Sequence, residues 1–297
     1  PAKAGFFGFR GKPAGMKVAL ITCSRLPDLH PDDELIRPVL KELAIETVTV
    51  DWTQPMPPGV DAIWLRTPWD YHRQLPRFLD WVACTEPIPM WNSREVVRWN
   101  SHKRYVGELY KAGLPVVPTR IYEPSQPVDE AELESWLRGK PLVVKPAVSA
   151  GSYKTSRYDH WNAAARQHVR ELHAEEAVML QPYFDKIEQH GERSLIFLDG
   201  NYSHAVRRHL PLLEGPEVDY LMQPVEASPA EREAAQKILA YLPFPDLLYA
   251  RVDLIPDPEG KPVLLELELI EPQLFLREHP AGAPVLARAF ARRLAQR

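Results

Sequence analysis

The chain alternates between short apolar runs and segments whose apolar residues recur at helical spacing. Over residues 17–112 these segments follow one another as strand, helix and strand, and a strand that returns through a helix gives a parallel sheet. The sequence therefore predicts an N-terminal α/β unit. Its expected strands are Lys17–Cys23, Thr47–Val50, Val60–Thr67 and Ile88–Trp91. Its expected helices are Asp32–Ala44, Leu75–Cys84, Ser93–Trp99 and Ser101–Ala112.

A new strand pattern begins just after Gly113, which predicts a lobe boundary near Leu114. Further along, Asp199-Gly200 favours a tight hairpin turn, and Ser228-Pro-Ala-Glu231 is a capping box that starts a helix. We expect strands over Val116–Tyr122, Pro141–Pro146, Val178–Phe184, Glu192–Leu198, Tyr202–Arg208, Leu247–Ile255 and Pro262–Ile270. We expect helices over Asp129–Arg138, Asp159–Glu176, Ser228–Tyr241 and Ala281–Arg297.

The last hairpin carries acidic side chains on both of its strands. Its second strand alternates, so Glu266 and Glu268 share one face. Folding the hairpin symmetrically about its turn sets Asp253 opposite Leu264 and diagonal to Glu266. Such a run is also typical of a solvated strand face. Three carboxylates from two strands, however, suit magnesium held by carboxylates and phosphate oxygens, which indicates a nucleotide nearby.

A lysine, Lys145, follows directly on the apolar run Leu142-Val-Val, where an unpaired ammonium group would be costly to bury. The loop behind it, Ala147–Thr155, is rich in small and hydroxyl residues. Such a loop can lay backbone N–H groups over a polyphosphate, with Lys145 as a point charge on its oxygens. It lacks the spacing of a P-loop. The plainer alternative is a surface loop after an edge strand.

Polar side chains also follow the predicted strand Val60–Thr67, in the stretch Arg66-Thr-Pro-Trp-Asp-Tyr71. Ligands of open parallel sheets bind beyond the carboxyl ends of the strands. Arg66 and Asp70 are therefore candidates for binding a small substrate. A structural Arg–Asp pair that closes the loop is the alternative.

Composition narrows the class of protein. The chain has 297 residues and a net charge of −4, with acids and bases interspersed, which argues against a nucleic-acid partner. It has no apolar run of about 18 residues, so no membrane span is expected. Its two cysteines lie far apart and favour a reduced, cytoplasmic protein. Residues 1–15 are expected to be a disordered lead-in ahead of a natural start at Met16.

In their order, these parts resemble the ATP-grasp superfamily of glutathione-synthetase-like proteins. The resemblance covers roughly Ser93 to Pro272, and no one of its motifs is specific by itself. Its motifs are Trp99-Asn-Ser-His-Lys103, Val143-Val-Lys-Pro146, Leu180-Gln-Pro-Tyr-Phe184, Gly191-Glu-Arg-Ser-Leu-Ile-Phe197, Arg251-Val-Asp253 and Leu265-Glu-Leu-Glu268. Three further stretches are similar to the cycloserine-forming O-ureido-serine cyclo-ligases. They are Arg66-Thr-Pro-Trp-Asp-Tyr71, Tyr202-Ser-His-Ala-Val206 and Leu267-Glu-Leu-Ile-Glu-Pro272.

The resemblance implies a mixed α/β and α+β chain, in which an N-terminal parallel-sheet domain precedes two α+β lobes that clasp ATP. The implied domains are residues 16–113, 114–182, which carry the lid, and 183–297, which carry the acidic hairpin. The implied partner is a small amino-acid-like substrate, and the oligomeric state stays open, with a homodimer among the alternatives.

The resemblance also implies roles for individual residues. For ATP it implies the phosphate lysines Lys103 and Lys145, the lid residues Ser149, Gly151 and Ser152, the adenine hinge Gln181, Tyr183 and Phe184, and a ribose acid, Glu192 or Glu188. For Mg²⁺, or Mn²⁺ in its place, it implies Asp253, Glu266 and Glu268. For catalysis it implies Arg207 facing the γ-phosphate, together with Lys145. For the substrate we add Arg66 on a carboxylate, Asp70 and Tyr71 on an amine, and Glu271 beside them.

Two residues depart from the usual ATP-grasp pattern. Glu268 stands where most members have asparagine, and the lid has a single glycine, Gly151. The implied activity is a ligase that converts a carboxylate to an acyl-phosphate, which an amine of the same or another molecule then attacks, with release of ADP and phosphate. The alternatives are a non-catalytic ATP-binding regulator, a ligase that joins two amino acids, and a phosphoryl-transferring relative.

Overall fold

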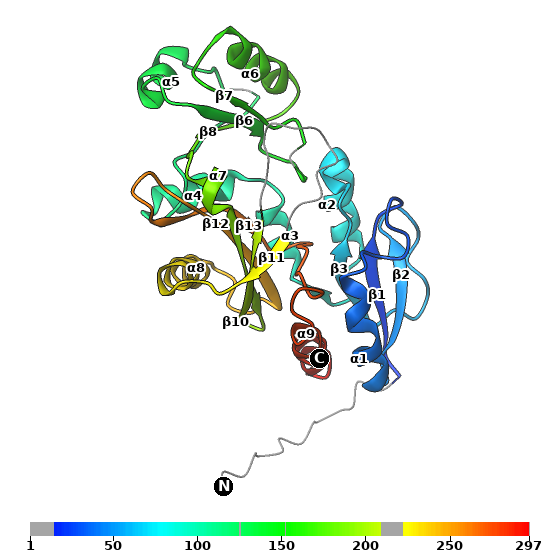
Figure 1. Ribbon diagram of the computed structural model, residues 1–297. Helices are drawn as coiled ribbons and strands as arrows, with labels where there is room; N and C mark the ends of the chain where they lie inside the picture. Colours follow the sequence, from blue (N-terminus) through cyan, green and yellow to red (C-terminus); the bar gives the residue numbers. More distant parts are fainter. Residues whose placement is uncertain (1–14, 125, 152, 209–221, 297) are drawn as a thin grey trace.

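Three sheets organise the chain (Figure 1). The computed structural model describes residues 15–124, 126–151, 153–208 and 222–296. The N-terminal sheet is parallel and has the order β2-β1-β3-β4. Its strands are β1 (Lys17–Thr22), β2 (Glu46–Asp51), β3 (Ala62–Thr67) and β4 (Met90–Trp91). The helices that follow its strands are η1 (Asp33–Leu35), α1 (Ile36–Glu42), η2 (Tyr71–Gln74), α2 (Leu75–Cys84), α3 (Arg94–Asn100) and α4 (Arg104–Lys111).

The second sheet is antiparallel, with the order β5-β8-β6-β7, and forms the small lobe at the top of Figure 1. Its strands are β5 (Arg120–Tyr122), β6 (Leu142–Pro146), β7 (Ser156–Tyr158) and β8 (Val178–Pro182). Its helices are α5 (Glu130–Leu137) and α6 (Ala163–Glu175). The apolar run before Lys145 packs in this lobe's core because Leu142 and Val144 are fully buried. The small-residue loop joins β6 to β7 and lies at the open end of the lobe.

The third sheet is antiparallel, with the order β11-β10-β9-β12-β13. Its strands are β9 (Glu192–Leu198), β10 (Asn201–Arg208), β11 (Met222–Val225), β12 (Tyr249–Pro256) and β13 (Pro262–Glu268). Its helices are α7 (Ile187–His190), α8 (Pro229–Tyr241) and α9 (Gly282–Leu294). The predicted capping box is confirmed, since Ser228 and Glu231 bond each other's backbone at the start of α8.

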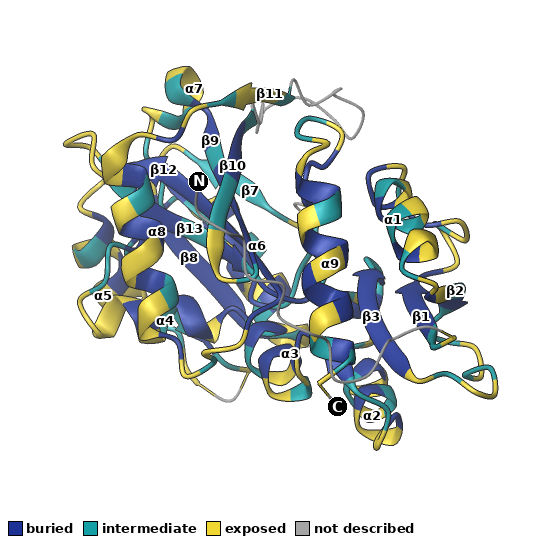
Figure 2. Ribbon diagram, turned by 90° about the horizontal axis from the view of Figure 1, so that it is seen from below, coloured by how far each residue is buried: buried dark blue, intermediate teal, exposed yellow. Residues whose placement is uncertain are grey.

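The C-terminal helix α9 joins the first and third sheets (Figure 2). Phe290 of α9 stacks on Trp64 of β3 with ring centroids 4.4 Å apart, and the same buried cluster contains Leu198 of β9. A helix with apolar residues on most of its circumference must be covered on both sides. The helix therefore anchors the N-terminal sheet against the third sheet.

The fold class expected from the sequence is confirmed, and the division into three domains stays a prediction. The strands β7 and β11 were not predicted; both are short, with three and four residues, and neither has a fully buried position. Among the described residues, no helix combines the length and the apolar character that crossing a bilayer requires.

Candidate functional site

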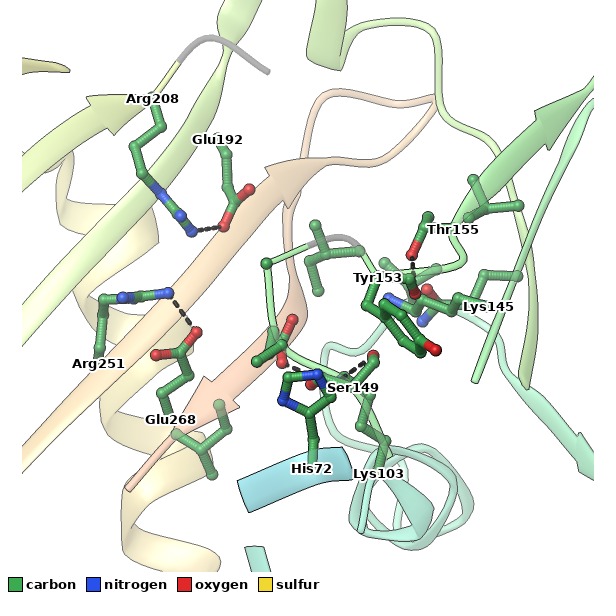
Figure 3. Close-up of a pocket in the computed structure, with 18 of the residues that line it drawn as sticks. His72, Lys103, Lys145, Ser149, Tyr153, Thr155, Glu192, Arg208, Arg251 and Glu268 are labelled. Carbon is green, nitrogen blue, oxygen red and sulfur yellow. Dashed lines mark hydrogen bonds and ion pairs between the residues drawn. The ribbon is translucent and has the colours of Figure 1, made fainter. Parts of the chain in front are cut away.

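A cavity of about 570 Å³ lies where the second and third sheets meet the N-terminal sheet. Its walls come from β6, β8, β12, β13, the helix η2 and the loop after β6. Figure 3 shows Lys145 and Thr155 on one side and Arg208, Glu192, Arg251 and Glu268 on the other. The volume is that of a pocket for a molecule of drug or nucleotide size.

Two lysines reach the cavity from different segments and are both nearly buried, Lys103 at 7% exposure and Lys145 at 8%. Lys103 Nζ lies 3.0 Å from Glu266 Oε1 and donates to the carbonyl of Ser149 at 2.7 Å. Burial lowers the pKa of Lys145 to about 8, although Glu266 opposes the shift. The two lysines thus bring positive charge to the cavity, and the neighbouring acidic side chains do not fully offset the burial of Lys145.

One face of the third sheet carries a chain of alternating charges. Arg208 pairs with Glu192 and also with Asp253, and Arg251 pairs with Asp253 and Glu268. The cross-strand register explains this order, because Arg208 lies opposite Glu192, and Arg251 opposite Glu268. The prediction that the three carboxylates of the last hairpin share one sheet face is confirmed.

The carboxylates of this face differ in charge state. Burial raises the pKa of Glu192 to about 8 and that of Glu268 to about 7, against the opposing pull of the arginines. Burial would also raise the pKa of Glu266, but Lys103 and Lys145 outweigh it and hold this pKa below its ordinary value. Arg208 and Arg251 likewise hold the pKa of Asp253 below its ordinary value against burial. Glu266 and Asp253 are therefore anions at neutral pH, while Glu268 is poised to gain or lose a proton.

Asp253 is not among the residues that line the cavity, so its expected place among the metal ligands stays a prediction. The side chain is 1% exposed and accepts bonds from Ser194 Oγ at 2.7 Å, Arg208 Nη2 at 2.9 Å and Arg251 Nη2 at 3.0 Å. These bonds use both carboxylate oxygens. Asp253 is therefore the buried anion that holds in place two arginines of the cavity lining.

The donor set that remains fits magnesium. Glu266 and Glu268 both line the cavity, with side chains 29% and 28% exposed. Mg²⁺ is usually held by one or two carboxylates together with substrate phosphates, and keeps several waters. Among the described residues no three acidic or histidine side chains converge on one point, so a metal here would need the oxygen atoms of a bound nucleotide.

A β-bulge decides which of two neighbouring arginines faces the cavity. The family resemblance implied this role for Arg207, which would lie opposite Glu192 if the hairpin ran evenly from Asp199-Gly200. The register instead shifts between Tyr202 and His204, so that Arg208 lies opposite Glu192. Such a bulge turns the following side chains to the other face. Arg208 lines the cavity, whereas Arg207 donates to the carbonyl of Gln189 at 2.5 Å.

A second bulge lies in the last hairpin, between Asp253 and Leu254. It sets Asp253 directly opposite Glu266, whereas symmetric folding about the turn predicted Leu264 as the partner. The predicted register was wrong by two positions: Leu254 already lies opposite Leu264, one position from the symmetric arrangement, and the bulge adds the second. Because side chains alternate with a period of two, the faces were still assigned correctly.

Arg66 is not in the cavity, which corrects its predicted contact with substrate. It is 1% exposed, and its Nε and Nη2 lie 2.7 and 2.6 Å from Asp33 Oδ1. The alternative that the sequence offered, a structural ion pair of Arg66, is therefore present, but its partner is Asp33 and not Asp70. Asp70 accepts a bond from Trp52 Nε1 at 2.7 Å and also lies outside the cavity lining.

Tyr71 and Glu271 do line the cavity and lie beside each other. Burial and the nearby Glu268 raise the pKa of Glu271 to about 8, and a hydrogen bond from Tyr71 opposes the shift. Trp69 Nε1 donates to the carbonyl of Glu271 at 2.9 Å, which ties this end of the cavity to the segment after β3. The pair offers a carboxyl group and a hydroxyl group to a polar ligand.

The opposite end of the cavity is formed by the link between the second and third sheets. Gln181, Tyr183 and Phe184 line it, and Gln181 is 2% exposed, with its side chain bonded to Thr119. Glu192 lines the cavity too, whereas Glu188 lies outside the lining and accepts a bond from Tyr183 Oη at 2.8 Å. Of the two acids expected at the ribose, the structure brings only Glu192 to the site.

The loop between β6 and β7 covers part of the cavity. Ser149 and Gly151 line it, and Ser152 lies outside the described residues. Tyr153, which sequence reasoning did not single out, packs on His72 of η2 with ring centroids 5.5 Å apart (Figure 3).

Sequence reasoning left open that either Arg207 or Arg208 meets a phosphate, and gave the role to Arg207. It assigned no role to Arg251, or to Arg25, His72 and Arg73 at the rim. Arg251 carried a usable signal, because it lies two positions before Asp253 on a strand and must share its face. The rim residues carried no such signal, since basic side chains at the surface are common.

Comparison with known proteins supports one family. Residues 18–92 match a family model described as the N-terminal domain of the D-cycloserine synthetase DcsG. Over 267 residues the chain is 33% identical to the cycloserine biosynthesis protein DcsG of Streptomyces lavendulae, covering 84% of this chain and 87% of that protein.

Solved structures support the same family. The crystal structure of D-cycloserine synthetase DcsG has a TM-score of 0.83 and 30% identity, and covers 94% of this chain and 99% of that one. The ATP-grasp ligase PsnB, in a complex with a phosphomimetic variant of its minimal precursor, Mg and ADP, has a TM-score of 0.61 at 14% identity, with 93% and 98% covered. This second likeness shows the fold alone.

Proposed function

Because the chain belongs to the ATP-grasp ligases, in the family of D-cycloserine synthetase, we propose that its cavity activates a substrate carboxylate as an acyl-phosphate and directs an amine nitrogen onto it. The chain is an ATP-dependent, ADP-forming ligase. The proposal concerns its intermediate, its substrate class and the residues that carry each step.

One observation carries the proposal: two lysines and two carboxylates from separate segments face one cavity. Lys103 and Lys145 offer ammonium groups to phosphate oxygens, and Glu266 and Glu268 offer carboxylate oxygens. A bound Mg²⁺ would be held by Glu266 and Glu268 and would neutralise charge on the phosphates. Gln181, Tyr183 and Phe184 would hold the adenine, and Glu192 the ribose hydroxyls.

The chemistry has two steps. In the first, a carboxylate oxygen of the substrate bonds to the γ-phosphorus of ATP while the bond to the β,γ-bridging oxygen breaks, which releases ADP. In the second, the amine nitrogen bonds to the carbonyl carbon, the bond to the phosphate oxygen breaks, and the nitrogen's proton leaves with the phosphate. Arg208 and Arg251 line the same cavity, and we assign them to the charge that develops on the transferred phosphoryl group, because preorganised cations of this kind lower the barrier.

The substrate end of the cavity favours an amino-acid-like molecule. Tyr71 and Glu271 would receive its amine through a hydroxyl group and a carboxyl group. A substrate whose nitrogen lies in the same molecule as its carboxylate, such as a ureido-serine, would cyclise, and this is the preferred class because the relative is a cycloserine synthetase.

The test is a phosphate-release screen with ATP and Mg²⁺ against amino acids, dipeptides, and ureido or hydroxylamine derivatives. We expect release of ADP and phosphate that depends on a substrate with both a carboxylate and an amine nitrogen. With ¹⁸O in the substrate carboxylate, one label should appear in the released phosphate.

Phosphate without the label would contradict the acyl-phosphate intermediate. A stable phosphorylated product would identify a phosphoryl-transferring enzyme instead. The Glu268→Gln variant is the control, because it keeps the side-chain shape and removes one proposed metal ligand.

A further inference from the structure

Strand β13, which carries Glu266 and Glu268, lies at the edge of its sheet, and within the described part of the chain β12 is its only neighbour along its length. An edge strand has a row of backbone N–H and C=O groups without strand partners. Here the edge is buried, since Leu267 is 1% exposed and Leu269 is fully buried. Buried backbone groups must find other partners, because an unpaired group costs the full penalty of losing water.

At the start of the strand, a backbone segment supplies these partners. Leu264 donates to the carbonyl of Pro115 at 2.8 Å and accepts from the N–H of Val117 at 2.9 Å. This single bridge ends before the two acidic residues. The part of the edge that carries them must be satisfied in another way.

Side chains of two residues near Lys103 take over at that point. Tyr105 Oη accepts from the N–H of Leu267 at 3.0 Å and donates to its carbonyl at 2.9 Å. Asn100 Nδ2 donates to the same carbonyl at 2.9 Å, and Asn100 Oδ1 accepts from the N–H of Leu269 at 2.8 Å. Both residues are buried, Tyr105 at 1% and Asn100 at 8% exposure.

We propose that Asn100 and Tyr105 are positioning residues that replace a missing neighbour strand and fix the carboxylates of Glu266 and Glu268 for metal binding. The backbone groups that they hold lie on both sides of Glu268, at the residue before it and the residue after it. The inference rests on the proposed function, because it takes these two carboxylates as the magnesium ligands.

The segment from Asn100 to Tyr105 also positions the lysine that faces the two carboxylates. Lys103 lies between Asn100 and Tyr105 in the sequence, and its Nζ reaches Glu266 at 3.0 Å. The spacing between phosphate cation and metal ligands is therefore determined by one short segment. A loss of the side-chain bonds would let β13 shift along its free edge and would loosen this spacing.

The test is the Tyr105→Phe variant, which removes one hydroxyl group and keeps the ring. Its matched control is Tyr249→Phe. Tyr249 is fully buried, lies outside the cavity lining, and donates its hydroxyl to backbone carbonyls, that of Ile270 at 2.8 Å among them. Both variants lose a buried hydroxyl bonded to backbone, but only the first touches Leu267.

The readout is Mn²⁺ binding in the presence of ADP, followed by the electron paramagnetic resonance signal of the free ion. Mn²⁺ is a suitable probe because carboxylate and water ligands suit it as they suit Mg²⁺. We expect Tyr105→Phe to weaken Mn²⁺ binding by about tenfold, or about 1.4 kcal/mol. Tyr249→Phe should bind Mn²⁺ as the unmodified protein does, although both variants should show a lowered Tm.

Two outcomes separate the inference from the proposed function. If Glu268→Gln leaves Mn²⁺ binding unchanged, the metal assignment is wrong and the inference is overturned with it. If Glu268→Gln weakens binding while Tyr105→Phe and Tyr249→Phe behave alike, only the positioning role is overturned. Should Tyr105→Phe fail to fold, Asn100→Ser provides the same comparison, since it removes the bonds to Leu267 and Leu269 from the other side chain.

Discussion

Replacement of Arg66 by methionine should reduce the stability of the protein and leave substrate affinity unchanged. The guanidinium contacts one carboxylate oxygen of Asp33 through two nitrogens, and it lies 5.3 Å from the centre of the Tyr249 ring. Asp33 is itself 3% exposed, so the variant would leave a buried carboxylate without its cation. Removal of one partner of a buried pair typically costs about 3–5 kcal/mol.

The magnitude can be measured through a double-mutant cycle. The single variants Arg66→Met and Asp33→Leu each leave one charge unpaired, whereas the double variant leaves none and should recover much of the lost stability. At roughly 2–4 °C per kcal/mol for a chain of about this size, Arg66→Met should lower the Tm by on the order of 10 °C. The substrate KM, measured by phosphate release at a temperature where the variant is folded, should change by less than about threefold.

The opposite pattern would refute this reasoning. A variant with an almost unchanged Tm and a substrate KM raised more than about tenfold would place Arg66 in the substrate pocket after all. A double variant whose loss equals the sum of the losses in Asp33→Leu and Arg66→Met would show that the two side chains do not interact.

Three further predictions concern the cavity. Because burial lowers the pKa of Lys145 to about 8, its charge is present below that pH and is lost above it. The KM for ATP should therefore rise by up to about tenfold per pH unit above pH 8. In Lys145→Arg, whose guanidinium keeps its charge, the rise should be less steep. Arg208→Gln should abolish most ligase activity and lower the Tm, since it removes a cation that pairs with Glu192 and Asp253. Arg207→Gln should keep activity within about twofold. Equal effects of the two variants in a kinetic assay would contradict the bulge argument. Gly191→Ala should lower the Tm more than Gly200→Ala does. Both glycines have positive φ, but only at Gly191 would the new Cβ clash with a neighbour, the carbonyl oxygen of Arg208 at 2.9 Å. Equal Tm losses would show that the strand adjusts freely.

The sequence by itself determined the elements and most of their chemistry. Periodicity is a local property, so the buried strand before Lys145 and the alternation of Glu266 and Glu268 could be identified without coordinates. The motifs around them resembled one superfamily in one order, and that resemblance led to the fold. Lys103, Lys145 and the hairpin acids were found in this way, and apart from Asp253 they line one cavity.

Only the tertiary structure decided which member of a polar pair faces the cavity. Two bulges, at residues 202–204 and 253–254, change the strand register, and no residue type in these strands announces them. The first places Arg208 at the site in place of Arg207. Arg66 pairs with Asp33, which lies 33 residues earlier in the chain. Over that distance the spacing of residues in the sequence does not indicate which side chains meet.

The same limit applies to the edge of β13. Whether an edge strand is covered by another strand, by solvent or by side chains depends on what packs beside it, and the sequence of the strand alone does not contain that answer. The partners Asn100 and Tyr105 come from a segment more than 160 residues earlier in the chain. Local pattern decides which side chains share a face, whereas long-range packing decides what that face meets, because contacts between distant segments depend on the whole chain's fold.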